Sequence, residues 1–342
     1  MSFNFKIGGT TSSSSASEER VQVLILGSGP AGLAAALYAG RAELNPLVLT
    51  GLEVGGQVTL TEIIENYPGF PEGVKGPELA ERFKKQAERF GARLVMDVAT
   101  EVDLRQRPIV VKTYSTTYRT DVLIIATGAS PRKLGVPGEE EYTGRGVSYC
   151  ATCDGWFFQD KDVIVVGGGD SAIEEGLFLT RYARSVTIVH RREQLRAGPL
   201  LQRRARANPK VSYLFNTVVE EILGDGEQVT GVRLRNVKTG EVYEKPIDGV
   251  FIFVGYIPNT KLFEGQLELD ERGYIKVHDW VHTDIPGVFA AGEVADPVYR
   301  QVITSAGMGA AAAIAAGHYL DEVLFAEEEQ QAENTVQASG EG

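Results

Sequence analysis

The chain carries, close to its N-terminus, the sequence Val21-Gln22-Val23-Leu24-Ile25-Leu26-Gly27-Ser28-Gly29-Pro30-Ala31-Gly32. Its apolar first half is typical of a buried strand, and its second half is a Gly-x-Gly-x-x-Gly turn. The Ala-rich segment Leu33 to Arg41 is predicted to be a helix, and Leu47 to Leu49 supplies a second strand. Strand, glycine turn and helix in this order form a dinucleotide-binding fingerprint, because the glycines let the backbone approach a pyrophosphate at the helix N-terminus.

The same pattern starts again in the middle of the chain. Residues Asp162 to Val166 are predicted to be a strand and Ile173 to Arg181 a helix. Between them lies a second glycine turn, formed by Gly167, Gly168, Gly169, Asp170, Ser171 and Ala172. Each copy also has a late apolar strand, Asp121 to Gly128 in the first and Asp248 to Gly255 in the second. Two parallel copies predict two dinucleotide-binding units in one chain.

A further strand and turn, Asp284 to Val294, is assigned back to the first copy. The fold class is therefore predicted to be α/β, with two Rossmann-like units, the second inserted in the first. The chain is expected to cross between them near Ser130-Pro131 and Tyr256-Ile257-Pro258, and two such crossings suit a hinge. The expected units are residues 21–131 with 257–325, and residues 132–256.

Composition excludes several classes of function. The net charge of -12 and the lack of a basic stripe argue against a nucleic-acid partner. The apolar run Ala306 to Ala316 is too short to span a membrane. Residues 1–20 have no apolar core and are expected to be a disordered tail, not a signal peptide, which favours a cytoplasmic protein. Residues 326–342 are rich in Glu and Gln and are expected to be a disordered acidic tail.

The only two cysteines, Cys150 and Cys153, are separated by two residues and followed by Asp154. A Cys-x-x-Cys pair supports thiol-disulfide exchange, and an adjacent carboxylate can move the proton that exchange requires. Half of a zinc site is a second interpretation, but all four histidines are distant in sequence, so no metal site is expected. An inert buried pair is the third.

The two units are expected to bind different nucleotides. In the second unit, the predicted strand Val186 to Val189 ends in His190, Arg191 and Arg192, with Arg196 a turn later. Arginines at this place suit the 2'-phosphate of NADP, which they bind bidentately; the alternative is a solvated basic patch. The first unit has no such cluster and is free to hold FAD.

Taken together, these motifs closely resemble the low-molecular-weight, bacterial-type thioredoxin reductases from about Val21 to Leu324. The resemblance rests on the two glycine turns, the Cys pair inside the second unit, the arginine cluster and three loops. These loops are Gly55-Gly56-Gln57, Glu65-Asn66-Tyr67-Pro68-Gly69 and Tyr299-Arg300-Gln301. The resemblance also rests on Ala126-Thr127-Gly128, at the end of the late strand of the first unit. It implies a homodimer that passes electrons from NADPH through FAD and the Cys pair to thioredoxin.

The resemblance also implies roles for individual residues. Cys153 is the thiol nearest the flavin, Cys150 is exchanged with thioredoxin, Asp154 is the acid/base, and Arg145 matches a thioredoxin-docking position. The expected FAD-binding residues are Gly27, Ser28, Gly29, Pro30, Ala31, Gly32, Thr50, Gly51, Gly55, Gly56, Gln57, Asn66, Ala126, Thr127, Gly128, Gly292, Glu293, Arg300, Gln301 and Val302. The expected NADPH-binding residues are those of the second glycine turn, Gly167 to Ala172, with His190, Arg191, Arg192 and Arg196.

One residue departs from the family pattern: Glu293 stands where the family usually has Asp after Gly292. Glu is a methylene longer, so its expected hydrogen bond to the flavin ribityl chain shifts. The sequence also leaves the partner open, since a glutaredoxin-like or other small dithiol protein is an alternative to thioredoxin. A flavoprotein that only senses nucleotides is a non-enzymatic alternative, although the presence of both cysteines argues against it.

The arginine cluster generates a prediction about cofactor preference. A charge-assisted hydrogen bond contributes about 1.5–3 kcal/mol, so losing two arginines costs on the order of 10²-fold in preference for NADPH. We expect the double replacement Arg191→Ala with Arg192→Ala to raise the Michaelis constant for NADPH far more than that for NADH. Steady-state kinetics with both nucleotides measures this. Equal effects on the two would identify the cluster as a solvated patch.

Overall fold

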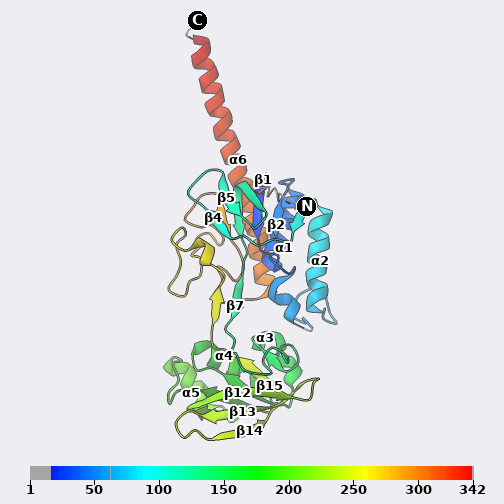
Figure 1. Ribbon diagram of the computed structural model, residues 1–342, viewed down its shortest axis with the longest axis vertical. Helices are drawn as coiled ribbons and strands as arrows, with labels where there is room; N and C mark the ends of the chain where they lie inside the picture. The colour runs from blue at the N-terminus through cyan, green and yellow to red at the C-terminus, as the bar shows by residue number, and fades with distance from the viewer. Residues whose placement is uncertain (1–16, 62, 341–342) are drawn as a thin grey trace, which may run out of the picture.

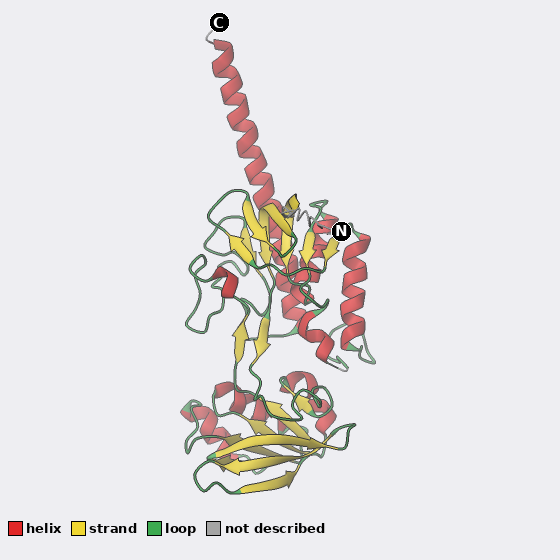
Figure 2. Ribbon diagram, in the orientation of Figure 1, coloured by secondary structure: helices red, strands yellow, loops and turns green. Residues whose placement is uncertain are grey.

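The computed structural model describes residues 17–61 and 63–340 and consists of two bodies joined by a narrow connection (Figures 1 and 2). One body contains the N-terminal strand and the long C-terminal helix, and the other contains the middle of the chain. Each body has its own buried apolar clusters on the two sides of a parallel sheet. No helix within the described ranges is both long and apolar enough to cross a membrane.

The first body is built on a sheet of seven strands. Its parallel strands are β1 (Ser17–Leu26), β2 (Leu47–Leu49), β3 (Arg93–Val95), β6 (Thr116–Ile125) and β17 (Val288–Ala290). An antiparallel extension adds β4 (Glu101–Asp103) and β5 (Ile109–Lys112). Its helical elements are α1 (Pro30–Arg41), η1 (Gly56–Leu60), α2 (Gly76–Arg89), η3 (Lys261–Phe263) and α6 (Val302–Gly340). Because β6 pairs with β1 and with β17, the late segment returns to the first unit, as predicted.

Both predicted tails need correction. Ser17 to Arg20 begin β1 and pair with Thr116 to Arg119 of β6, where Glu18 and Arg20 form cross-strand ion pairs with Arg119 and Asp121. Residues 326–340 continue α6 beyond the body of the protein (Figure 1), because this segment is rich in Ala, Glu and Gln and contains no Pro. The predicted disorder at residues 1–16 and 341–342 falls outside the described residues.

The second body combines two sheets. The parallel sheet contains β8 (Val147–Ser148), β9 (Asp162–Val166), β10 (Ser185–His190), β11 (Val211–Phe215) and β15 (Gly249–Ile252). The antiparallel sheet contains β12 (Thr217–Gly224), β13 (Val229–Asn236) and β14 (Val242–Pro246). The helical elements are α3 (Ala151–Asp154), η2 (Gly155–Phe158), α4 (Asp170–Leu179) and α5 (Pro199–Ala207). Here β9 to α4 repeats the strand, glycine turn and helix of the first body.

The connection between the bodies is a two-stranded antiparallel ribbon. Its strands are β7 (Ala129–Pro131) and β16 (Tyr256–Pro258), which pair Ser130 with Ile257. The ribbon lies between the two bodies in Figure 1. The predicted fold class, two Rossmann-like α/β units with one inserted in the other, is confirmed.

Glycines allow helices α1 and α6 of the first body to pack closely against each other. A Cβ on Gly309 of α6 would lie 2.0 Å from the backbone oxygen of Ala31 in α1, and a Cβ on Gly32 would lie 1.9 Å from that of Gly27. No side chain fits into either contact. The two helices therefore approach each other with backbone against backbone, which fixes the α1 N-terminus and its glycine turn against α6.

This contact predicts opposite effects of alanine at two glycines of α6. We expect Gly309→Ala to lower the free energy of unfolding by about 1–3 kcal/mol, because the added methyl group must displace α1 backbone. Gly317→Ala is the matched control, since its Cβ would meet only Leu44 Cδ1, at 3.8 Å. We expect this variant to gain about 0.5–1 kcal/mol from helix propensity. Urea unfolding followed by circular dichroism measures both, and equal effects would contradict the packing argument.

Candidate functional site

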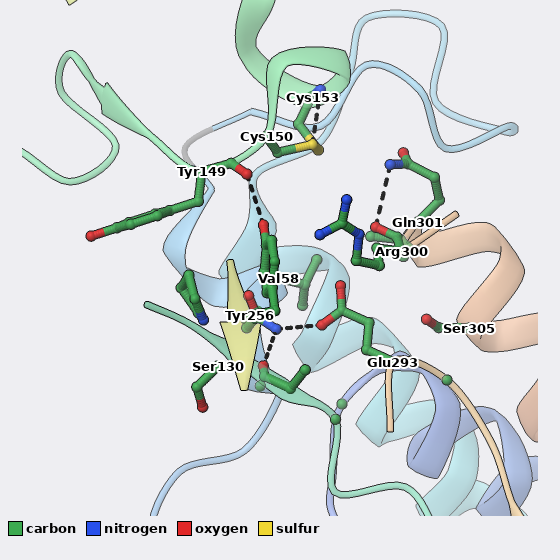
Figure 3. Close-up of a pocket in the computed structure, with 18 of the residues that line it drawn as sticks. Val58, Ser130, Tyr149, Cys150, Cys153, Tyr256, Glu293, Arg300, Gln301 and Ser305 are labelled. Atoms are coloured by element: carbon green, nitrogen blue, oxygen red, sulfur yellow. Dashed lines mark hydrogen bonds between the residues drawn. A yellow bond between two sulfur atoms is a disulfide. The ribbon is translucent and has the colours of Figure 1, made fainter. Parts of the chain in front are cut away.

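A cavity of about 1090 Å³ lies between the two bodies and receives residues from both. The first body contributes its glycine turn, the ends of its strands and the start of α6, and the second contributes the Cys motif and α4 (Figure 3). Of the predicted site residues, those that line this main cavity are Gly27, Ser28, Gly29, Pro30, Ala31, Thr50, Gly56, Gln57, Ala126, Thr127, Gly128, Cys150, Cys153, Asp154, Ser171, Gly292, Glu293, Arg300, Gln301 and Val302.

The Cys pair forms a disulfide at one end of this cavity. The bond joins Cys150 and Cys153, whose Cα atoms are 5.3 Å apart. Cys150 caps the short helix α3, and its sulfur accepts a hydrogen bond from the Cys153 backbone N–H at 3.2 Å. Both residues are partly exposed. A disulfide with these properties is open to attack by a thiolate.

Asp154 lies next to this disulfide, at the end of α3. Ser148 Oγ donates a hydrogen bond to Asp154 Oδ2 at 2.6 Å. Burial raises the pKa of the Asp154 carboxyl, and the hydrogen bond from Ser148 opposes this by lowering it. A carboxyl with a raised pKa beside a thiol pair is suited to hold and release a proton.

The first glycine turn leaves backbone N–H groups at the start of α1 open to the main cavity. Gly29 precedes α1, and no side chain caps the first turn of that helix, so its N–H groups remain available to a ligand. Ser28 Oγ donates to the backbone oxygen of Thr50 at 3.0 Å, which fixes the turn against the end of β2. A Cβ on Gly56 would lie 3.2 Å from Gly29 Cα, so the loop after β2 closes over the turn without side chains. These features fit the pyrophosphate of a dinucleotide.

Glu293 lies deep in the main cavity, where its carboxylate accepts a hydrogen bond from Gln57 Nε2. Burial raises the pKa of Glu293 to about 7, although Arg300 and the Gln57 hydrogen bond act in the opposite direction. Although Glu293 is one methylene longer than the Asp expected at this position, its carboxylate still accepts the hydrogen bond from Gln57. A buried carboxyl that titrates near neutrality is a typical feature of functional sites.

Contacts between the bodies converge beside the disulfide. Gln301 Nε2 donates to Thr152 Oγ1 at 3.2 Å, and Asn66 donates to Gln301 Oε1 at 3.2 Å. Tyr256 OH donates to the backbone oxygen of Tyr149 at 2.7 Å, and the Arg300 guanidinium stacks over the Tyr256 ring at 4.4 Å (Figure 3). The side chains that join the bodies therefore touch the residues on both sides of Cys150.

The second glycine turn and the arginine cluster lie mostly outside the main cavity. Only Ser171 of that turn lines it. Arg191, Arg192 and Arg196 are exposed at the end of β10 and form no ion pair with any described residue. The Arg196 backbone N–H donates to Gly168 O at 2.7 Å, which places this arginine beside the turn. His190 is buried, and the described residues give its Nε2 no hydrogen-bond partner.

The remaining predicted residues have structural places near the cavity. Gly32 lies in the first turn of α1, Gly51 and Gly55 belong to the loop after β2, and Asn66 donates a hydrogen bond to Gln301, which lines the cavity. Arg145 is exposed, and its guanidinium donates to the backbone oxygens of Glu141 and Gly226. The described residues contain no cluster of three or more His, Cys, Asp or Glu residues placed to hold a metal ion.

Several lining residues were not predicted from the sequence. They include Ser148, Thr152, Glu175, Phe178, Tyr256 and Ser305. Ser148 was visible in the sequence as the residue two before Cys150, but nothing in its spacing indicated a contact with Asp154. Tyr256 was predicted only as part of a crossing. Burial raises the pKa of its hydroxyl, so it remains a hydrogen-bond donor at neutral pH.

Comparison with known proteins agrees with this site. A family model described as pyridine nucleotide-disulphide oxidoreductase matches residues 21–317. The chain is 50% identical to a thioredoxin reductase of Coxiella burnetii over 88% of this chain and 97% of that protein. A crystal structure of thioredoxin reductase from Streptococcus pyogenes has a TM-score of 0.85 at 46% identity, covering 89% and 99% of the two chains. The Lactococcus lactis thioredoxin reductase in the "FR conformation" has a TM-score of 0.60 at 44% identity, with coverage of 88% and 99%.

The pKa of Glu293 generates a prediction about stability. The folded pKa of about 7 lies above the ordinary value of 4.5, so stability is lost as pH rises from 4.5 to about 7. In protein stripped of nucleotide, we expect the wild type to lose up to about 3 kcal/mol of unfolding free energy across this window. Glu293→Gln removes this slope, whereas Glu264→Gln at an exposed position retains it. Urea unfolding at a series of pH values measures the slopes, and parallel curves for all three proteins would contradict the assignment.

Proposed function

This chain belongs to the pyridine nucleotide-disulphide oxidoreductase family, and we propose that it is an NADPH-dependent thioredoxin reductase containing FAD. The observation that carries the proposal is the shared cavity, which brings a disulfide from one nucleotide-binding unit to the glycine turn of the other. A disulfide held at a dinucleotide site is what electron transfer between nucleotide and thiol requires. A disulfide that only stabilised the fold would need no such cavity.

The first body supplies the residues proposed to hold FAD. The turn from Gly27 to Gly32 and the α1 N-terminus suit the pyrophosphate, and Gln57 and Glu293 suit the polar groups of the ribityl chain and ring. The N-terminus of α6 at Val302 lines the same cavity and supplies a positive helix dipole. When bound, FAD supplies two-electron redox chemistry between nicotinamide and the disulfide.

The Cys pair and Asp154 are proposed to carry the thiol chemistry. Cys153 faces the flavin, and Cys150 is the thiol exchanged with the partner, as the family resemblance implies. After reduction of the pair, Cys150 as a thiolate attacks the partner's disulfide. Asp154 is proposed to donate the proton that the leaving partner thiolate requires, which its raised pKa favours.

The NADPH site is proposed to lie at the second glycine turn and the exposed arginine cluster. Because these residues are mostly outside the main cavity, nicotinamide and disulfide cannot reach the flavin in one arrangement of the bodies. The β7–β16 ribbon supports a rotation of the second body that exchanges them. The thioredoxin reductases of Streptococcus pyogenes and Lactococcus lactis are similarly identical to this chain, yet their TM-scores are 0.85 and 0.60. Such a difference is expected when two rigid bodies are arranged differently in the two structures.

Thioredoxin is the proposed partner, with Arg145 in the docking surface. Arg145 is exposed and belongs to the same body as the Cys pair, so it keeps its place relative to Cys150 when that body rotates. A glutaredoxin-like or other small dithiol protein remains the alternative, and turnover with a panel of such proteins distinguishes them. We also propose a cytoplasmic location, where thiols are kept reduced.

A homodimer is proposed on the basis of an apolar face along α6. Ile303, Ile314 and Trp280 are 45%, 49% and 60% exposed, and Trp280 packs beside Gly307. Ile303, Gly307 and Ile314 lie on one side of the helix by their spacing. A second copy covering this face would bury these side chains, and sedimentation analysis of the purified protein tests the state.

Cysteine variants test the proposed function. We expect Cys150→Ser and Cys153→Ser each to retain FAD and its reduction by NADPH but to lose thioredoxin turnover. Flavin reduction needs only nicotinamide, whereas dithiol transfer needs both sulfurs. Stopped-flow absorbance measures flavin reduction, and a coupled assay measures turnover. Substantial turnover by either variant would remove the pair from the electron path.

A further inference from the structure

A second cavity, of about 410 Å³, lies against the Cys motif. Among its lining residues only Ile63 belongs to the first body, and all others lie between Gly144 and Asp248 in the second. The cavity is therefore carried almost entirely by the body that carries the Cys pair. A rotation of that body leaves the second cavity beside Cys150 and Cys153.

Ser148 and Asp154 line both this second cavity and the main cavity. Asp154 therefore has a route to solvent other than the main cavity. This matters because the main cavity is the space that FAD is proposed to fill, and that nicotinamide is proposed to reach when the second body rotates. A proton donor reached only through that space would be cut off whenever it is filled.

The side chain of Ser148 is held firmly between backbone and carboxylate. Ser148 ends β8 and is 4% exposed. Its hydroxyl accepts a hydrogen bond from the Cys150 backbone N–H at 3.0 Å. It has two possible acceptors, Asp154 Oδ2 at 2.6 Å and the Cys150 backbone oxygen at 3.2 Å, of which the carboxylate is the nearer. Within residues 17–61 and 63–340, the bond from Ser148 is the only hydrogen bond made to the Asp154 side chain. The Ser148 hydroxyl thus links the Cys150 backbone to the Asp154 carboxylate.

We propose that Ser148 is a positioning residue that holds the Asp154 carboxyl beside the Cys pair, and that Asp154 exchanges protons with solvent through the second cavity. The proposal deepens the proposed thioredoxin reductase function and rests on it for the source of electrons. The proposal concerns the route by which a proton reaches Asp154, and this route is formed by the protein and not by the cofactors.

Protons and electrons balance in this scheme. The reduced site holds two electrons on the Cys pair and two protons, one on Cys153 and one on Asp154. Cys150 as a thiolate attacks the partner disulfide, a mixed disulfide forms, and the released partner thiolate takes the Asp154 proton. Asp154 as a carboxylate then takes the Cys153 proton, and Cys153 attacks Cys150 Sγ. The second partner thiolate leaves with that proton, so the partner gains two electrons and two protons.

The next cycle requires Asp154 to be protonated again. Oxidation of NADPH delivers two electrons and one proton to the site, so one further proton must come from solvent in each turnover. That proton enters through the second cavity and binds Asp154. The requirement follows from the stoichiometry of a nicotinamide reductant and a dithiol product, whatever the order of the steps.

Burial and the hydrogen bond from Ser148 are the main influences on the pKa of Asp154. Burial raises the pKa of the Asp154 carboxyl, and the hydrogen bond from Ser148 acts in the opposite direction. Besides Asp154, the second cavity is lined by two cationic and two anionic side chains, Arg145, Lys161, Glu227 and Asp248. The other ionisable groups that line the main cavity are Glu53, Tyr149, Glu174, Glu175, Tyr256, Arg272, Glu293, Tyr299 and Arg300.

A double-mutant cycle on the holoenzyme tests the Ser148 role. We expect Ser148→Ala to lower thioredoxin turnover roughly 10-fold, because a hydrogen bond to a charged group is lost. Asp154→Asn removes the acid and costs about 10²–10⁴-fold. The double variant should be no slower than Asp154→Asn alone, and Ser148→Thr, which keeps the hydroxyl, should restore turnover. Independent, multiplicative losses in the double variant would overturn the proposal.

A pH profile separates this role from a merely structural one. The rate of iodoacetamide alkylation of Cys150 is measured against pH in dithiothreitol-reduced holoenzyme. Since Ser148 lowers the pKa of Asp154, the inflection due to Asp154 should move to higher pH in Ser148→Ala and vanish in Asp154→Asn. Ser185→Ala is the matched control, because Ser185 of β10 also donates a hydrogen bond of 2.6 Å to an aspartate, Asp162 of β9. This control variant should leave the pH profile of alkylation unchanged. Coincident profiles for wild type and Ser148→Ala would overturn the proposal.

The second cavity has a test of its own. Lys161 lines it, so Lys161→Trp fills the space while Lys161→Met removes the charge without filling it. We expect the Trp variant alone to slow turnover several-fold and to show a larger solvent deuterium isotope effect. Equal behaviour of the two variants would overturn the proton route. If the wild type fails to reduce thioredoxin, the proposed function fails, whereas the alkylation profile still reports the coupling of Ser148 and Asp154.

Discussion

The disulfide of this protein is carried by one body, while most of the cavity it faces is built by the other. The β7–β16 ribbon joins the two bodies, and side-chain hydrogen bonds near Cys150 add to this connection. This division imposes an order on the proposed chemistry, because the proposed nicotinamide site and the Cys pair belong to the same body. The arrangement described here presents the Cys pair to the main cavity and leaves the arginine cluster exposed.

The contacts that hold this arrangement are few and polar. Tyr256 OH and Gln301 each make one hydrogen bond to the Cys motif, and Arg300 stacks on Tyr256. Individual hydrogen bonds of this kind contribute about 0.5–1.5 kcal/mol, so the arrangement is held by a few kcal/mol at most. Energies of that size permit exchange between arrangements, and a bound nucleotide is sufficient to shift the balance. The rigid parts are elsewhere, in the close packing of α1 on α6 and in the two parallel sheets.

Much of this organisation could be predicted from the sequence, because glycine turns after apolar strands have few other uses. The two units, the insertion and the Cys pair all follow from such local patterns. The contact between Ser148 and Asp154 could not be predicted, since it depends on how a two-residue strand ends against a four-residue helix. The raised pKa of Glu293 depends on burial by distant segments, which spacing does not reveal. The strand at Ser17 to Arg20 was missed because its stability comes from pairing with β6, and its composition is that of a polar tail.

The most direct test of the electron path is an anaerobic titration of the protein with NADPH, followed by flavin absorbance. If the disulfide and the flavin are in redox contact, the protein accepts four electrons, two on flavin and two on the Cys pair. Addition of oxidised thioredoxin then returns them. Uptake of only two electrons by the wild type, or four electrons that thioredoxin does not remove, would contradict the role assigned to Cys150 and Cys153.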